Sequence, residues 1–125
     1  MMLITKQIDR ALRENHIVNH NPDGPPFFGA SKEVTIDHQP VLKLFTPWGA
    51  CTWLITERDP DNPDILFGLC DLGMQSPEMG SVSLSEIESV QGPFGLRIER
   101  DRYFLAKRTL TEYADQARDA GRIVA

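Results

Sequence analysis

The chain has 125 residues, of which 41% are hydrophobic and 25% are charged, and its formal net charge is -5. A chain of this length buries one core without disulfides but is too short for two ordinary domains, so a single domain over residues 1–125 is predicted. The ordinary charged fraction and the negative net charge argue against a disordered chain and against broad binding of nucleic acid.

The two cysteines, Cys51 and Cys70, lie in apolar runs, where a buried thiol behaves as a small hydrophobic group. The N-terminus has no basic segment followed by a long apolar run, and no stretch reaches the ~18 apolar residues of a membrane span. These features predict a cytoplasmic protein with reduced cysteines.

The first predicted element is a short amphipathic helix over residues 6–15, with Thr5 as its N-cap. Residues 19–30 are rich in turn residues and prolines, which predicts a loop. A weak strand is predicted at residues 33–36.

Three strands are predicted at residues 41–45, 51–57 and 65–72, because these short apolar runs are rich in β-branched and aromatic residues. Tight connections with proline and glycine separate them, which favours an antiparallel meander. Residues 73–80 are predicted to form a loop.

Capping boxes at Ser83 and Thr109 predict a short helix over residues 84–90 and a final helix, with a brief strand at residues 96–99 between them. Gly121 is the expected C-cap of the final helix. Its predicted buried stripe consists of Leu110, Tyr113, Ala114 and Ala117.

The predicted fold class is therefore α+β. A three- to four-stranded antiparallel sheet packs with an N-terminal helix, a C-terminal helix and one short helix. One shared core is expected to hold Trp53, Leu54, Phe67 and Tyr113.

Acidic residues gather in two places. Asp59, Asp61 and Asp64 stand at nearly alternate positions, as in the start of a calcium loop, but two prolines interrupt them and the glycine and the final glutamate of such a loop are missing. A solvated turn is the favoured interpretation. Asp71 and Glu78 flank a loop and would serve acid and base chemistry only if they met across a cleft, so a turn or cap role is favoured.

No motif predicts a catalytic residue, a metal ligand or a cofactor. His16, His20 and His38 show no recognised metal spacing, and the chain lacks a nucleophile elbow and a phosphate-binding loop. Surface histidines are expected.

A basic stretch and a tryptophan complete the candidate surfaces. Arg97, Arg100 and Arg102 alternate with acidic residues, which favours an ion-paired strand edge over contacts to phosphate. Trp48, at a Pro-Trp-Gly turn, either joins the phenylalanines at 27 and 28 in an exposed contact surface or covers one end of the sheet.

Ordered motifs carry a family resemblance. They are Thr-Pro-Trp-Gly-Ala at 46–50, Thr-Trp-Leu at 52–54, Asp-Pro at 59–60, Leu-Phe-Gly-Leu-Cys-Asp-Leu-Gly at 66–73 and Ile-Glu-Arg-Asp at 98–101. The chain resembles a bacterial family of unknown function carried on plasmids and integrative elements, over about two thirds of its length and outside residues 19–38. The resemblance implies a mobile-element setting and no chemistry.

Two functions follow as hypotheses. The first is a non-enzymatic, protein-binding accessory protein of a mobile element that antagonises a host defence system such as restriction or CRISPR interference. Its expected contact residues are Trp48, Asp59, Asp61, Asp64 and Glu78. Its expected partner is a protein, such as a basic nucleic-acid-binding complex, without direct nucleic-acid or membrane binding.

The alternative hypothesis is a small metal-dependent hydrolase. Its metal and its acid and base groups would come from the five carboxylates Asp59, Asp61, Asp64, Asp71 and Glu78.

Overall fold

The computed structural model describes residues 2–20 and 36–125. The described chain contains three α-helices, a short 3-10 turn and five strands, which confirms the α+β class. In chain order they are α1 (Lys6–His20), β1 (Leu42–Phe45), β2 (Thr52–Arg58), β3 (Ile65–Asp71), β4 (Glu78–Ser83), α2 (Leu84–Ser89), the 3-10 turn (Pro93–Gly95), β5 (Glu99–Arg100) and α3 (Leu110–Ala120).

Some predictions fall outside the described residues. These are the phenylalanines at 27 and 28 and most of the weak strand at 33–36, of which only Ile36 is described, outside any strand.

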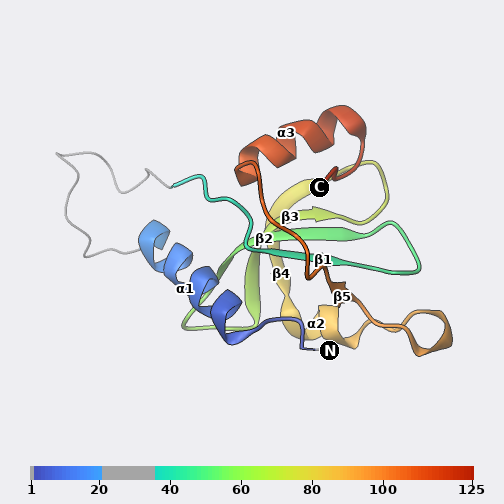
Figure 1. The fold of residues 1–125 in the computed structure, drawn as a ribbon, viewed down its shortest axis with the longest axis horizontal. Coiled ribbons are helices and arrows are strands. Elements are labelled where there is room, and N and C mark those ends of the chain that lie inside the picture. The colour runs from blue at the N-terminus through green and yellow to red at the C-terminus, as the bar shows by residue number, and fades with distance from the viewer. Residues whose placement is uncertain (1, 21–35) are drawn as a thin grey trace.

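The strands form one antiparallel sheet in the order β4-β3-β2-β1-β5 (Figure 1). The predicted meander of β1, β2 and β3 is confirmed, and two further strands extend it to five. The first half of β4 falls in the segment predicted as loop, because its sequence Glu-Met-Gly-Ser-Val-Ser has low β-propensity. It forms a strand because it pairs with β3 over six positions, from Ile65 opposite Ser83 to Cys70 opposite Glu78.

The sheet separates two apolar clusters, and the prediction of one shared core is wrong. Trp53 belongs to the cluster beneath α1, together with Leu12 and Leu44, whereas Leu54 and Tyr113 belong to the cluster beneath α3. Trp53 and Leu54 are neighbours in β2, and successive side chains of a strand point to opposite faces. Figure 1 shows α1 and α3 on different sides of the sheet.

The helix ends agree with all four predicted caps. Thr5 Oγ1 accepts a hydrogen bond from Ile8 N at 3.2 Å at the start of α1. Ser83 caps α2, and Thr109 begins α3 with a complete capping box. The predicted four-residue buried stripe of α3 is also confirmed. Gly121 ends α3 in the left-handed conformation, with φ 76°.

The far end of α1 differs from the prediction. The helix continues past residue 15 to His20, and its last turn carries His16 and His20. These two residues are four apart, so they share one face of the helix.

Candidate functional site

A cavity of about 500 Å³ opens beside the last turn of α1. Its polar wall includes His16, Asn19, His20 and Glu57. Its apolar wall comes from β3, β4, the start of α3 and the segment before β1, and consists of Ile36, Ile65, Phe67, Met79 and Leu110. A volume of this size suits a small ligand, and no lysine or arginine is among the described lining residues.

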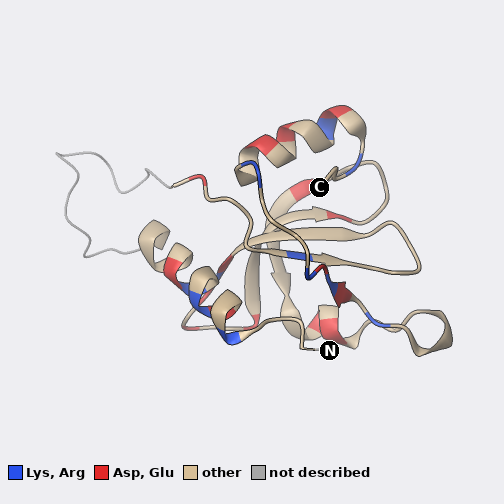
Figure 2. Ribbon diagram, viewed as in Figure 1, with Lys and Arg blue, Asp and Glu red and all other residues tan. Residues whose placement is uncertain are grey.

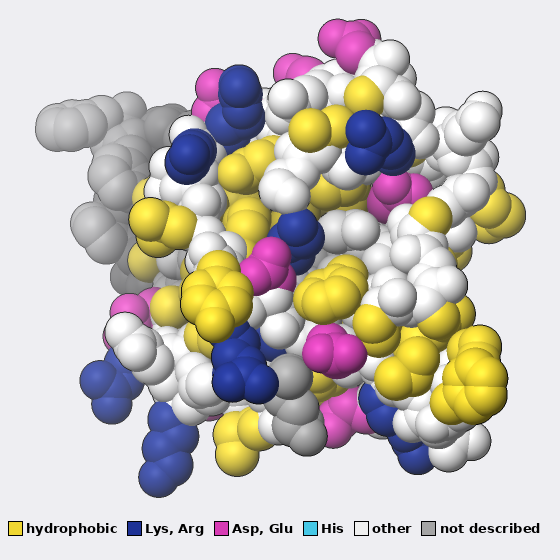
Figure 3. Space-filling model, turned by 45° about the vertical axis from the view of Figure 1, so that its right-hand side comes forward, with side chains coloured by type: hydrophobic (Ala, Val, Ile, Leu, Met, Phe, Trp, Pro, Cys, Tyr) yellow, Lys and Arg dark blue, Asp and Glu magenta, His cyan; other side chains and the backbone are white. Residues whose placement is uncertain are grey.

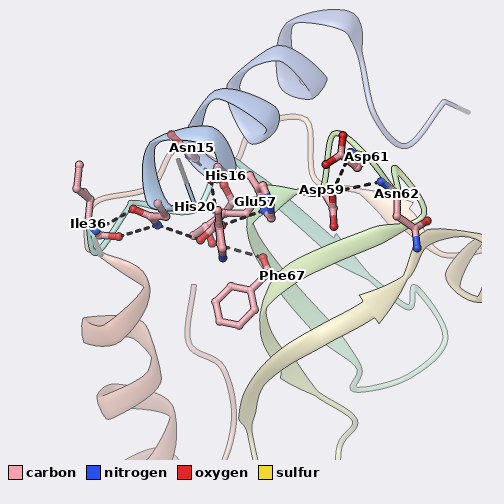
Figure 4. Close-up of polar contacts among 11 residues, drawn as sticks. Asn15, His16, His20, Ile36, Glu57, Asp59, Asp61, Asn62 and Phe67 are labelled. Carbon is pink, nitrogen blue, oxygen red and sulfur yellow. Dashed lines mark hydrogen bonds and ion pairs between the residues drawn. The ribbon is translucent and has the colours of Figure 1, made fainter. Parts of the chain in front are cut away.

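Two histidines and a glutamate meet on the polar wall (Figure 4). The Nδ1 atoms of His16 and His20 each lie 3.4 Å from Glu57 Oε1. The two imidazole rings stack, with centroids 4.0 Å apart and planes inclined by 14°. Within residues 2–20 and 36–125, these three form the one group of at least three His, Cys, Asp or Glu ligands compact enough for a metal ion.

A β-bulge places the glutamate in the cavity. The register of β2 against β3 shifts between Ile55, which pairs with Gly68, and Glu57, which pairs with Phe67. Cross-strand partners share a face of the sheet, so Glu57 lies on the face of Phe67 and not on that of Ile55. Without the extra residue in β2, strict alternation would put Glu57 under α1 with Ile55.

Two asparagines hold the bulge and the helix together. Asn15 Nδ2 donates to the backbone oxygen of Thr56 at 2.9 Å, and Asn19 Nδ2 donates to Glu57 Oε2 at 3.1 Å. Asn19 also exchanges hydrogen bonds with the backbone of Ile36, at 3.2 and 2.9 Å. The carboxylate therefore has a fixed orientation, with Oε2 bonded and Oε1 turned toward the histidines.

The other carboxylate oxygen, Glu57 Oε1, is buried without a hydrogen bond in the described chain. The side chain of Glu57 is 8% exposed, and its Oε1 accepts no hydrogen bond from the described residues. His38 Nε2 is likewise buried and has no hydrogen-bond partner in the described part of the chain, and His38 lines the same cavity. Buried polar atoms are normally satisfied, so unpaired atoms on a cavity wall point to a ligand or to water.

Two carboxylates of the acidic loop at residues 59–64 accept hydrogen bonds from nearby backbone and side-chain groups. Asp59 Oδ1 accepts from the backbone of Asp61 at 2.8 Å and of Asn62 at 3.2 Å, as Figure 4 shows, and these bonds lower the pKa of Asp59. Asp64 accepts from Ser83 Oγ at 2.6 Å and from Ser85 N at 2.8 Å. Its pKa is lowered, mainly by the Ser83 hydroxyl. These two carboxylates stabilise a turn and the start of α2, while Asp61 is exposed.

The other two carboxylates lie at the opposite end of β3. Asp71 is 2% exposed and accepts from the backbone of Gly73 and of Ile123, both at 2.9 Å, which ties the C-terminal segment to the sheet. Glu78 is exposed and pairs in register with Cys70. A strand of seven residues separates Asp64 from Asp71, roughly 20 Å of chain, so the five carboxylates do not gather in one place.

The predicted contact residue Trp48 is half-buried against the core beneath α1. A Cβ added at Gly92 would overlap the indole ring, so the backbone of Gly92 lies directly on it. Gly92 N donates to Leu96 O at 2.7 Å, and Leu96 N donates to Pro93 O at 3.1 Å. Trp48 thus supports a hydrogen-bonded loop, seen at the lower right of Figure 1.

Phe94 lies at the tip of this loop, and no sequence motif marks it as a contact residue. Its side chain is fully exposed, at 102%, and its backbone has φ 58°, a region that bulky residues rarely adopt. Tyr103 and Leu105 follow later in the chain and are 94% and 80% exposed. Figure 3 shows exposed hydrophobic side chains in several places on the face it views, between charged ones.

Two of the three arginines in the basic stretch hold backbone segments. Arg100 Nη1 donates to the carbonyls of Met2 at 2.7 Å and Leu3 at 3.1 Å, and Arg97 Nη1 donates to that of Glu88 at 3.0 Å. Figure 2 shows lysines and arginines interspersed with acidic residues and no continuous basic strip on the ribbon of the described chain.

The histidine and glutamate cluster was missed for two reasons. The predicted helix ended before His16, so the four-residue spacing of the histidines was not read as a shared helix face. Glu57 ends an apolar run, and no sequence pattern shows the bulge that turns it. The usable signal was His-x-x-x-His at the end of an amphipathic helix.

No helix of the described residues is both long and apolar enough to cross a membrane. Residues 3–124 match the model of a family described as "Protein of unknown function (DUF2958)". No curated protein and no solved structure matches the chain.

Proposed function

The chain belongs to the DUF2958 family, and we propose that it acts as a non-enzymatic accessory protein of a mobile genetic element that binds a host protein and thereby antagonises a defence system such as restriction or CRISPR interference. The observation that carries the binding role is the exposed, strained Phe94. The mobile-element setting is proposed from the resemblance of the sequence motifs.

The backbone conformation of Phe94 costs free energy in the unbound protein. A left-handed backbone costs a residue with a side chain roughly 1 to 2 kcal/mol, and a bare phenyl ring gains nothing from burial in the free protein. Strained residues persist where the surrounding structure holds them, and such positions cluster at binding sites. Here the loop is held by the bridge between Gln91 and Arg97, by its backbone hydrogen bonds and by the ring of Trp48.

An aromatic ring held rigidly in water suits an interface, because a few buried aromatic anchors supply most of the binding energy and a rigid anchor loses little entropy. The net charge of -5 and the exposed Asp61 and Glu78 favour a basic partner, and nucleic-acid-binding defence complexes carry such surfaces. The anchor proposed from the structure is thus Phe94, with Trp48 as its support.

The test is quantitative capture of host proteins by the tagged full chain, with nuclease present. Phe94→Asn removes the ring at a position where asparagine accepts the backbone conformation, and Tyr103→Asn removes an equally exposed ring elsewhere. We expect a small set of proteins that wild type and Tyr103→Asn retain equally and that Phe94→Asn retains at least about tenfold less. Identical capture by all three variants would contradict the proposal.

The defence role has its own readout. In a strain with an active restriction system, expression of the wild-type chain should raise the transformation efficiency of unmodified plasmid, and Phe94→Asn should not. Equal protection by both variants would show that Phe94 is not the anchor, and no protection in strains with restriction or CRISPR systems would contradict the antagonist role.

A further inference from the structure

We infer that His16, His20 and Glu57 form a binding site for a divalent transition-metal ion, with Zn²⁺ as the best fit. This site is separate from the loop of Phe94 and does not depend on the proposed protein-binding function. The residues come from the last turn of α1 and the bulge of β2, which together form one wall of the cavity.

Two of the three distances between donor atoms match those around a tetrahedral ion. Zinc binds imidazole nitrogen and carboxylate oxygen at about 2.1 Å, so two ligands at the tetrahedral angle lie about 3.4 Å apart. Glu57 Oε1 lies 3.4 Å from Nδ1 of His16 and 3.4 Å from Nδ1 of His20. All three donor atoms lie within 4.8 Å of one another. A metal ion lies in the plane of an imidazole ring that binds it, so the two stacked rings must rotate before both can bind one ion.

Burial supplies the second, independent observation. Glu57 is more than nine-tenths buried, its Oε1 accepts no hydrogen bond from the described residues, and this oxygen points at the two histidines. A buried carboxylate is costly unless it is paired with a charge or coordinates a metal. A divalent cation bound by the two imidazoles and the carboxylate would supply that charge.

The environment of the ligands resembles that of other metal sites. Ligating carboxylates are usually held by hydrogen bonds from a second layer of residues, and Asn19 Nδ2 holds Glu57 Oε2 at 3.1 Å. His20 Nδ1 also lies 3.0 Å from the backbone oxygen of His16. Because a metal takes the Nδ1 lone pair, binding requires the other tautomer of His20 and gives up this hydrogen bond.

The donor set selects among metals. Two imidazole nitrogens and one carboxylate oxygen suit zinc and its transition-metal neighbours, whereas calcium and magnesium prefer oxygen ligands alone. Three protein ligands leave the fourth position of a zinc ion open, and since all three line the cavity, that position faces it. Water or a small ligand in the cavity would occupy it.

The experiment uses the full chain without an affinity tag, stripped with a chelator and then titrated with Zn²⁺ by calorimetry. Co²⁺ serves as a spectroscopic probe, because its visible absorption reports the coordination geometry. We expect one ion per chain, a higher melting temperature with Zn²⁺, and a tetrahedral or five-coordinate Co²⁺ spectrum.

Three variants locate the ion. His20→Gln and Glu57→Gln each remove one ligand and should weaken Zn²⁺ binding at least about 100-fold. Asp59→Asn removes the same charge as Glu57→Gln from the same cavity but touches none of the three ligands, so it should change binding by less than about tenfold. His20 is 56% exposed at the end of α1, so its variant should fold even if the buried Glu57→Gln does not.

Failure of wild type to bind Zn²⁺ or Co²⁺ would overturn the site. So would equal binding by wild type and His20→Gln, because the ion would then lie elsewhere, for example on the cysteines. Neither result bears on capture of a protein partner through Phe94.

Discussion

Phe94 and Tyr103 are equally exposed aromatic residues, but only Phe94 has a positive φ. The backbone of Phe94 is therefore strained and that of Tyr103 is not. The side chain of Phe94 buries no surface that would offset this cost in free energy. Asparagine tolerates the left-handed region far better than phenylalanine does.

We therefore expect Phe94→Asn to raise the free energy of unfolding by about 1 kcal/mol, because it relieves strain and removes no buried contact. Urea denaturation of the two purified variants measures this. Tyr103→Asn is the control and should change stability by less than about 0.5 kcal/mol. A loss of stability in Phe94→Asn would mean that the ring packs in the free protein.

The thiol of Cys70 is the second residue with a distinct chemical expectation. Burial raises the pKa of Cys70 to about 11, and the thiol is free. At pH 8 only about one molecule in a thousand then carries the reactive thiolate, against roughly a quarter for a free cysteine.

Alkylation of Cys70 at pH 8 should accordingly be at least about 100-fold slower in the native protein than in urea. Peptide mass spectrometry after timed labelling measures the rate at each cysteine. Fast native labelling of Cys70 would indicate an accessible thiolate and would revive a redox or nucleophile role.

Individual residues differed in how far their roles were readable from sequence. The capping residues Thr5, Ser83 and Thr109 and the C-cap Gly121 were predictable, because a cap acts on a backbone only a few positions away. Glu57 was not, since its position depends on a register shift against β3, 10 or more residues along the chain.

At the scale of elements, local signals predicted α2, α3 and the three central strands to within about two residues at most ends. The exceptions are elements whose ends depend on distant contacts. The last turn of α1 is held by Asn15 and Asn19 against β2, and β4 is a strand only because β3 lies beside it. Tertiary contacts of this kind override weak local preferences.

One pair of glycines tests the close packing of the strands. Gly68 and Gly80 face each other in the register of β3 and β4. A Cβ at Gly68 would overlap the carbonyl oxygen of Leu54 and lie 2.8 Å from the Cα of Ile55, both backbone atoms of β2. A Cβ at Gly80 would meet nothing within 4 Å.

Gly68→Ala should therefore cost about 3 kcal/mol or more, since backbone atoms of β2 must move, and should also disturb the adjacent bulge. Gly80→Ala, its matched control, should be neutral or stabilising by up to about 1 kcal/mol, because alanine restricts the unfolded chain. Thermal and urea unfolding of both variants give the comparison. Similar stability of the two would contradict the close approach of β2 and β3.

At the scale of the whole molecule, the sheet stands between two apolar layers that share it. Leu12 on α1 is fully buried in one layer, and Leu110 on α3 is 4% exposed in the other. The strands join the two layers, because their alternating side chains contribute to both faces. The proposed metal site lies at the edge where the last turn of α1 approaches the start of α3.

The two separate apolar layers predict that the stability costs of substitutions in different layers add. Leu12→Ala and Leu110→Ala should each cost about 2 to 5 kcal/mol, because each removes a large buried side chain. Since the two residues pack in separate clusters and share no cluster partner, their costs should add to within about 0.5 kcal/mol in the double variant. Within one layer the outcome should differ: Leu12→Ala combined with Leu44→Ala, both in the cluster beneath α1, should depart from additivity. Urea denaturation of the three single and two double variants, relative to wild type, measures both cycles. Strong coupling between Leu12 and Leu110 would show that the two layers act as one core across the sheet.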